Sequence, residues 1–210
     1  MFDNNSHTFY FVRYPLGAGG THLSNIISLD ETIAPRGTIK KDSYFEFLIS
    51  SYQSKLSTAH LPGHCIISDH MWAKNLSTSY QHSASVHLGH AASFFWAKPL
   101  LDRFQNKKYI LLTFTDIKSR QCILQREKSL FTTTTLNNKY YVEEMSYFYS
   151  TRIQESGKID ADINLAIETY LLFKPNITEL VLLINQQYHL NIPVNQAQQL
   201  HDIWLPKVLN

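Results

Sequence analysis

The stretch Phe9–Ser24, FYFVRYPLGAGGTHLS, sets how the fold begins. It opens with a short run of aromatic and β-branched residues that stops at Pro15, a pattern typical of a buried strand. Apolar residues at helical spacing begin after residue 21, so the sequence predicts a strand over 8–14 and a helix over 21–29. Between the two lie three of the 7 glycines of the chain, Gly17, Gly19 and Gly20.

Segments typical of strands and of helices alternate along the rest of the chain. Runs rich in isoleucine, leucine and tyrosine predict strands over 64–70 and 107–115, and a further strand can start at residue 163. Helical spacing of apolar residues predicts helices over 42–54, 89–104, 117–130, 140–153, 176–188 and 192–205. This alternation predicts an α/β fold with a mainly parallel sheet.

Composition limits the kinds of protein that the chain can be. It has 210 residues, 44% of them hydrophobic, with no repeat or linker, so we expect a single domain over 1–210. A net charge of +2 favours neither nucleic acid nor membrane as a partner, and we expect a small molecule instead. The N-terminus lacks a signal pattern, and Cys65 and Cys122 suggest no disulfide framework. We therefore expect a cytoplasmic protein.

The glycine-rich turn has the features of an anion-binding loop. Its position between a strand and a helix places it at the carboxyl end of a sheet strand, where α/β sheets bind ligands. Backbone N–H groups of Gly19, Gly20 and Thr21, together with the helix dipole, would face a phosphate or a sulfate there. The turn is neither a Walker A loop, which needs a lysine, nor a dinucleotide fingerprint, since His22 stands where its last glycine would be.

Three segments resemble the sulfotransferase-like P-loop family. The loop residues Pro15, Gly19, Gly20, Thr21 and Leu23 look like the family's loop for the 5′-phosphosulfate of 3′-phosphoadenosine 5′-phosphosulfate. The segment 167–193 is similar to the family's strand, turn and helix near the C-terminus, and STAHLPGH at 57–64 is similar to its Thr-His-Leu-Pro segment.

The resemblance implies a fold and a reaction. The fold would be a three-layer P-loop-type domain with four to five strands flanked by helices, and the reaction would move a sulfuryl group from that cofactor to a hydroxyl of a small acceptor. His60 would be the base, with His70 as a competing candidate, because a histidine titrates near neutral pH. The family's loop lysine is absent, so Arg13 or His22 would stabilise the bridging oxygen.

The resemblance also implies which residues hold the cofactor. Gly17, Gly19, Gly20 and Thr21 would surround the 5′-phosphosulfate. Ser119 and Arg120, which follow the strand predicted over 107–115, would contact the 3′-phosphate, although their spacing departs from the family's pattern.

Two other hypotheses remain open. A divergent P-loop kinase or nucleotide hydrolase would use the same loop with Mg²⁺, and Asp69 or Asp116 would then supply the carboxylate. A protein that kept the fold and lost its chemistry would also explain the missing lysine, so enzymatic activity is an expectation, with a transferase favoured. The histidines clustered at residues 60–90 fit no metal-ligand spacing, and we expect no metal site.

Overall fold

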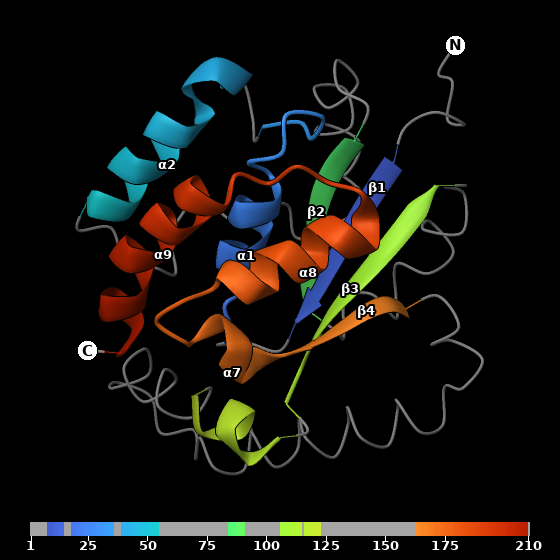
Figure 1. Cartoon of the computed structure of the whole chain (residues 1–210), viewed down its shortest axis with the longest axis vertical. Coiled ribbons are helices and arrows are strands. Elements are labelled where there is room, and N and C mark those ends of the chain that lie inside the picture. The colour runs from blue at the N-terminus through green and yellow to red at the C-terminus, as the bar shows by residue number, and fades with distance from the viewer. Residues whose placement is uncertain are drawn as a thin grey trace.

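A computed structural model describes residues 8–14, 18–35, 39–54, 84–90, 106–114, 116–122 and 163–209. In this part of the chain, four parallel strands form one sheet in the order β2-β1-β3-β4, and helices pack against it (Figure 1). The predicted α/β class with a mainly parallel sheet is confirmed. The strands are β1 (Thr8–Tyr14), β2 (Ala84–His90), β3 (Lys107–Thr113) and β4 (Ile163–Glu168).

The labelled helices come from both ends of the chain. A 3₁₀ turn, η1 (Lys41–Ser43), leads into α2, and residues 117–122 form the yellow-green helix below β3 in Figure 1. Apart from the short α7, which the sequence did not predict, the remaining helices follow their predicted segments to within a few residues at each end, as is usual for helix boundaries. They are α1 (Gly20–Ile27), α2 (Tyr44–Gln53), α7 (Thr169–Leu172), α8 (Thr178–Tyr188) and α9 (Val194–Leu209).

The strand order creates a switch point beside β1. This strand pairs with β2 on one side and β3 on the other, so that Val12 lies between Leu88 and Ile110. The chain moves from β1 to β2 in one direction and from β3 to β4 in the other. Right-handed crossovers in opposite directions leave the sheet on opposite faces. The carboxyl ends of β1 and β3 are therefore the place where an open α/β sheet binds ligands.

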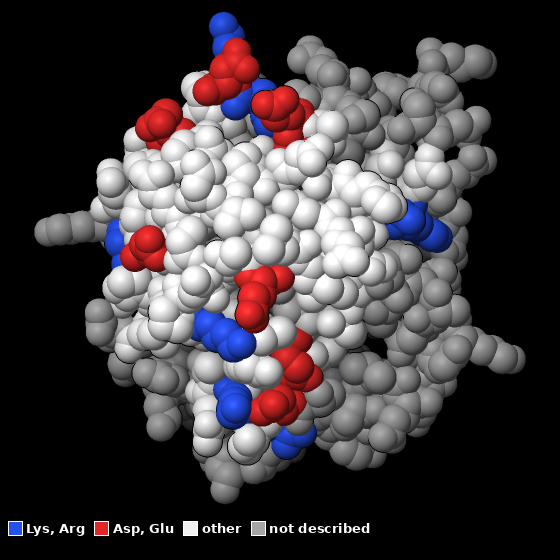
Figure 2. Space-filling model, in the orientation of Figure 1, with Lys and Arg blue, Asp and Glu red and all other residues white. Residues whose placement is uncertain are grey.

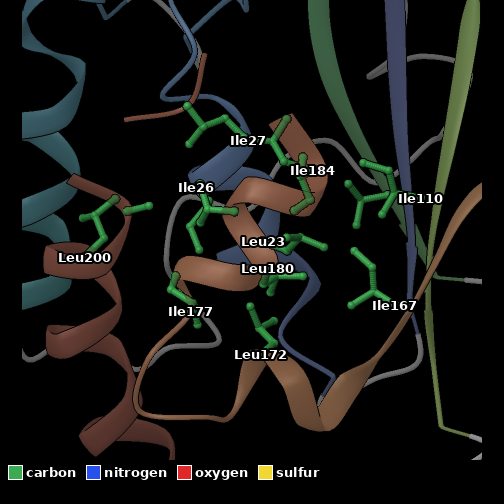
Figure 3. Close-up of a cluster of buried hydrophobic side chains, with 14 of the residues drawn as sticks. Leu23, Ile26, Ile27, Ile110, Ile167, Leu172, Ile177, Leu180, Ile184 and Leu200 are labelled. Carbon is green, nitrogen blue, oxygen red and sulfur yellow. The ribbon is translucent and has the colours of Figure 1, made fainter. Parts of the chain in front are cut away.

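The core lies between one face of the sheet and the helices. Tyr10 and Val12 alternate along β1 with Phe9 and Phe11, which are buried on the other face. Burying one aliphatic side chain contributes about 1.5–3 kcal/mol, so this cluster dominates the stability of the fold. Figure 3 shows it, with Leu23, Ile26 and Ile27 of α1, Ile110 and Ile167 of the sheet, and Leu180 and Ile184 of α8.

The last helix packs against three other helices. α9 contacts α1, α2 and α8, and in Figure 1 it runs beside α2. Its predicted buried face, Ala197, Leu200 and Trp204, is confirmed, since all three side chains are buried. The C-terminal helix is therefore part of the core that surrounds α1.

Two elements, α7 and β2, were not predicted from the sequence. Residues 84–90 form β2, so the helix predicted over 89–104 is wrong at Gly89 and His90. Val86 and Leu88 alternate with Ser85 and His87, which is a strand period, but the run is short and polar. β2 lies at one end of the described sheet and pairs only with β1 there. The strand predicted over 64–70 and the helix over 140–153 lie outside the described residues.

No helix in the described ranges combines the length and the apolar character needed to cross a membrane.

Candidate functional site

The candidate site is the loop that joins β1 to α1. Gly19 is the N-cap of α1 and has φ +80, a left-handed conformation that favours glycine. A Cβ at this position would lie 2.8 Å from Cδ2 of Leu172 and 3.2 Å from the ring of Trp204. Both the backbone and the packing therefore require glycine here.

Gly20 is required by packing alone. A Cβ on Gly20 would lie 2.2 Å from Cγ of Tyr14, inside the space of that ring. The glycine lets the last side chain of β1 lie directly against the first turn of α1. Two of the three loop glycines thus have a reason in the fold itself, separate from any ligand.

The start of α1 is suited to an anion. The first N–H groups of a helix have no partner within the helix, and the helix dipole places partial positive charge there. Gly19 offers no side-chain cap, and the first turn contains no acidic residue. Thr21, which is half-buried, adds a hydroxyl in that turn. This end of α1 lies at the carboxyl end of β1, at the switch point.

His22 lies in the core, whereas a catalytic role would require its side chain to reach a ligand at the loop. Its side chain is 1% exposed and stacks on Trp204, with ring centroids 4.1 Å apart and planes 9° apart. Its Nδ1 lies 2.9 Å from the hydroxyl of Tyr52, and its Nε2 lies 3.1 Å from Nδ1 of His201. The sequence placed His22 on α1 but could not show that α2 and α9 supply its partners.

The hydrogen bonds of this cluster fix the tautomers of both neutral histidines. His201 Nε2 lies 2.7 Å from the carbonyl oxygen of Lys174, which can only accept, so this nitrogen carries the proton. Its Nδ1 then accepts from Nε2–H of His22, and Nδ1 of His22 accepts from the hydroxyl of Tyr52. Asn25 in turn donates to the Tyr52 oxygen at 3.0 Å.

Burial shapes the acid–base behaviour of His201. Burial lowers its pKa below the ordinary 6.5, against the smaller opposing effects of the hydrogen bond to Lys174 and of the nearby Asp202 carboxylate. The neutral chain of donors and acceptors is therefore the stable form near pH 7.

Ser119 already has a carboxylate as its partner. Its hydroxyl donates to Oε2 of Glu168 at 2.7 Å and accepts from the N–H of Tyr170 at 3.1 Å. The N–H of Asp116 also donates to Glu168 Oε2, at 3.2 Å. A phosphate group placed against Ser119 would meet this negative charge. Sequence analysis missed Glu168; its place as the last residue of a strand is the only sequence signal for it.

Of the other predicted site residues, the structure describes Arg120 and the backbone of Arg13. Arg120 donates through Nε to the carbonyl oxygen of Phe114 at 3.0 Å, which holds it at the end of β3. Arg13 lies within β1, where its backbone pairs with Gly89 and Leu111. His60 and Gly17 lie outside the described residues, as do His70 and Asp69.

A cavity lies near the other end of α1. This cavity of about 440 Å³ is lined by Leu29, Glu31, Lys41 and Tyr44 among others. Lys41 Nζ donates to the carbonyl oxygens of Ser28 at 2.6 Å and of Ile33 at 2.9 Å. These bonds close the turn that follows α1. Burial lowers the pKa of Lys41 to about 8, against the smaller opposing effects of the Asp30 and Glu31 carboxylates.

The charges are mixed on the face drawn in Figure 2. Most acidic and basic side chains lie in the upper and lower parts of this face, with a few at its sides, and a wide uncharged area lies above an acidic group near the centre. The sequence between Glu179 and Asp202 contains no charged residue apart from histidine, which agrees with this neutral area over α8 and the start of α9. Within the described ranges, no group of three or more His, Cys, Asp or Glu residues could hold a metal ion.

Comparison with known proteins assigns no family. No protein-family model matches the chain, and no curated protein is significantly similar to it in sequence. The functional argument therefore rests on the loop and its surroundings.

Proposed function

We propose that the chain binds a phosphorylated, nucleotide-type ligand at the β1–α1 loop. The backbone N–H groups of Gly19, Gly20 and Thr21 would hold a phosphate or sulfate group. The observation that carries the proposal is the start of α1, which has no side-chain cap and no acidic residue and which follows an inner strand at its carboxyl end.

The reaction that the loop's resemblance favours is sulfuryl transfer within a three-layer P-loop-type domain. The acceptor hydroxyl oxygen would attack the sulfur of 3′-phosphoadenosine 5′-phosphosulfate in line while His60 takes its proton. The bond between sulfur and the 5′-phosphate oxygen would break, and the loop N–H groups would stabilise the charge on the departing phosphate. Arg13 is the candidate for the missing lysine, because His22 is buried.

The second phosphate of that cofactor has no ready site at Ser119. Binding there would require the Ser119 hydroxyl to leave Glu168, to which it donates at 2.7 Å. The 5′-phosphosulfate is therefore the part of the cofactor on which the proposal rests.

A magnesium-dependent nucleotide reaction is the second candidate. Asp116 lies three residues after the end of β3, the strand next to β1, and a P-loop enzyme places its metal-binding carboxylate near such a strand end. Oδ1 of Asp116 accepts from the N–H of Lys118 at 2.8 Å, and Oδ2 takes no part in that hydrogen bond. A preference for Mg²⁺-nucleotide would favour this candidate.

Calorimetric titration tests both candidates. The ligands are 3′-phosphoadenosine 5′-phosphate and ATP with Mg²⁺, and the proteins are the native chain, Thr21→Asp and Thr178→Asp. An aspartate in a first helical turn favours the helix and repels an anion, so Thr21→Asp can lose binding without losing its fold. We expect micromolar binding that weakens at least about tenfold in Thr21→Asp, equivalent to about 1.4 kcal/mol.

Thr178→Asp makes the same change at the start of α8 and serves as the control. It should bind like the native chain. Equal loss in both variants, or no binding of either ligand to the native chain, would contradict the proposed site.

A further inference from the structure

A buried pair of histidines lies directly behind the loop. His22 and His201 join α1 to α9 through a 3.1 Å contact between Nε2 and Nδ1. The Trp204 ring that stacks on His22 also meets the loop, since a Cβ on Gly19 would lie 3.2 Å from it. One aromatic ring thus contacts both the pair and the loop.

The pair can accept one proton without breaking its hydrogen bonds. A protonated His201 would still donate through Nε2 to the Lys174 carbonyl and would donate through Nδ1 to His22. His22 would then carry its own proton on Nδ1 and donate to the oxygen of Tyr52, whose hydroxyl proton would turn away from His22. A second proton would set two N–H donors against each other across 3.1 Å. The pair therefore has two bonded arrangements that differ by one proton.

We propose that binding of a phosphate or sulfate group at the loop is coupled to the uptake of one proton by the His22–His201 pair. The inference rests on the proposed function, because the anion must bind at the start of α1. The proton supplies a positive charge behind a loop whose sequence contains no lysine.

The surrounding charges leave the pair neutral until an anion arrives. On α9, Asp202 favours the protonated form of His201, but burial has the larger effect. Lys207 of α9 donates to the backbone oxygens of Tyr52 and Ser54 on the side of α2. The turn after α7 contributes the Lys174 carbonyl. On α1 and α2, the polar groups facing the pair in the described contacts are the neutral Asn25 and Tyr52.

The size of the coupling follows from Coulomb's law. Two unit charges about 10 Å apart, at an effective dielectric constant of about 20, change each other's free energy by about one pKa unit. Linkage is reciprocal, so protonation should tighten anion binding by up to about tenfold. A shift confined to this pair is informative, because an anion that merely screened the protein's charge would act on every histidine.

Nuclear magnetic resonance of the imidazole nitrogens tests the inference in the full chain. Sulfate is the probe because its charge does not change between pH 5 and 8, and chloride at equal ionic strength is the control. We expect the pKa of the pair to rise by about one unit in saturating sulfate and to stay where it was in chloride. The Nε2–H tautomer of both rings at pH 8 is the signature of the neutral arrangement.

The outcomes separate the two proposals. Amide shifts at residues 19–21 on adding sulfate report binding independently of the histidines. Binding without a change in the pKa of the pair would overturn the inference and leave the proposed function standing. Absence of those amide shifts would overturn the proposed function and the inference with it.

A variant adds an independent check. His201→Asn keeps an acceptor near the position of Nδ1 and removes the imidazole that takes the proton in the arrangement above. Its sulfate affinity should therefore depend less on pH between 8 and 6 than that of the native chain. His189→Asn, at the exposed end of α8, should keep the pH dependence of the native chain. Equal pH dependence in the native chain and His201→Asn would also contradict the inference.

Discussion

Gly20 is glycine because the ring of Tyr14 occupies the space that a side chain would need. The Cβ of an alanine would lie 2.2 Å from Cγ and 2.3 Å from Cδ1 of that ring, so the ring or the helix must move. Gly19 differs from it, since its φ of +80 adds backbone strain to close packing. The glycines that attract attention in the sequence are therefore explained first by packing.

Gly20→Ala should lower the free energy of unfolding by about 1–3 kcal/mol, the usual cost of overpacking a well-packed site. The physical cause is the Tyr14 ring, so Tyr14→Ala should make the same glycine substitution nearly neutral. Urea unfolding of the two single variants and the double variant gives the coupling energy. A cost that is equal with and without the Tyr14 ring would show that the clash is not its source.

At the scale of elements, a polar chain of contacts through the core links α1, α2 and α9. Asn25, Tyr52, His22 and His201 pass hydrogen bonds from one to the next and end on the Lys174 carbonyl. The four residues come from three helices, with His22 and Asn25 on α1, Tyr52 on α2 and His201 on α9. His22 and His201 are 179 residues apart in the sequence. A buried polar chain of this kind specifies one arrangement of the helices, because any other arrangement leaves buried donors and acceptors without partners.

The pKa of His201 makes stability depend on pH. Burial holds the pKa in the folded chain below 6.5, so below that pH the unfolded chain binds more protons than the folded one. Well above pH 6.5, the protonation of His201 does not affect the free energy of unfolding. As the pH drops below 6.5 toward the folded pKa, this free energy should fall by up to about 1.4 kcal/mol per pH unit. Chemical unfolding between pH 8 and 5 measures this slope.

The comparison variant for this slope is His201→Asn. In this variant the free energy of unfolding should change less steeply with pH, by the equivalent of up to one bound proton. Sulfate that binds the loop should also make this slope shallower in the native chain. A slope that is the same in the native chain and the variant would mean that His201 is not the group that titrates.

The sequence predicted elements better than it predicted their contacts. β1, β3, α1, α8 and α9 follow directly from local periodicity and turn residues. β2 was missed because Ser85, His87 and Gly89 dilute its alternation, and its place beside β1 is a tertiary fact. In the same way, His22 was readable as a residue of the first helix, but the partners that draw it into the core were not.

At the scale of the whole molecule, charge is unevenly spread around the carboxyl edge of the sheet. The start of α1 offers N–H groups without an acidic neighbour, whereas the start of helix 117–122 is already held by Glu168 and Asp116. The two helix starts follow neighbouring strands, β1 and β3, yet only the first has the electrostatics of an anion site. The two helix starts therefore cannot be compared from their loop sequences alone, because Glu168, the carboxylate at the start of helix 117–122, comes from β4.

Glu168→Gln should tighten the binding of sulfate or phosphate at the loop by a few-fold at low salt. The amide oxygen of glutamine can still accept from the Ser119 hydroxyl, while the negative charge at this edge is removed. Such an effect acts through solvent-exposed space, so it should fade above about 0.5 M salt, where the screening length is only a few ångströms.

Glu179→Gln makes the same change of net charge on the first turn of α8. If both variants tighten binding equally, the effect comes from net charge alone, and the anion does not bind at the carboxyl edge. If Glu168→Gln alone tightens it, the bound anion and Glu168 share that edge of the sheet.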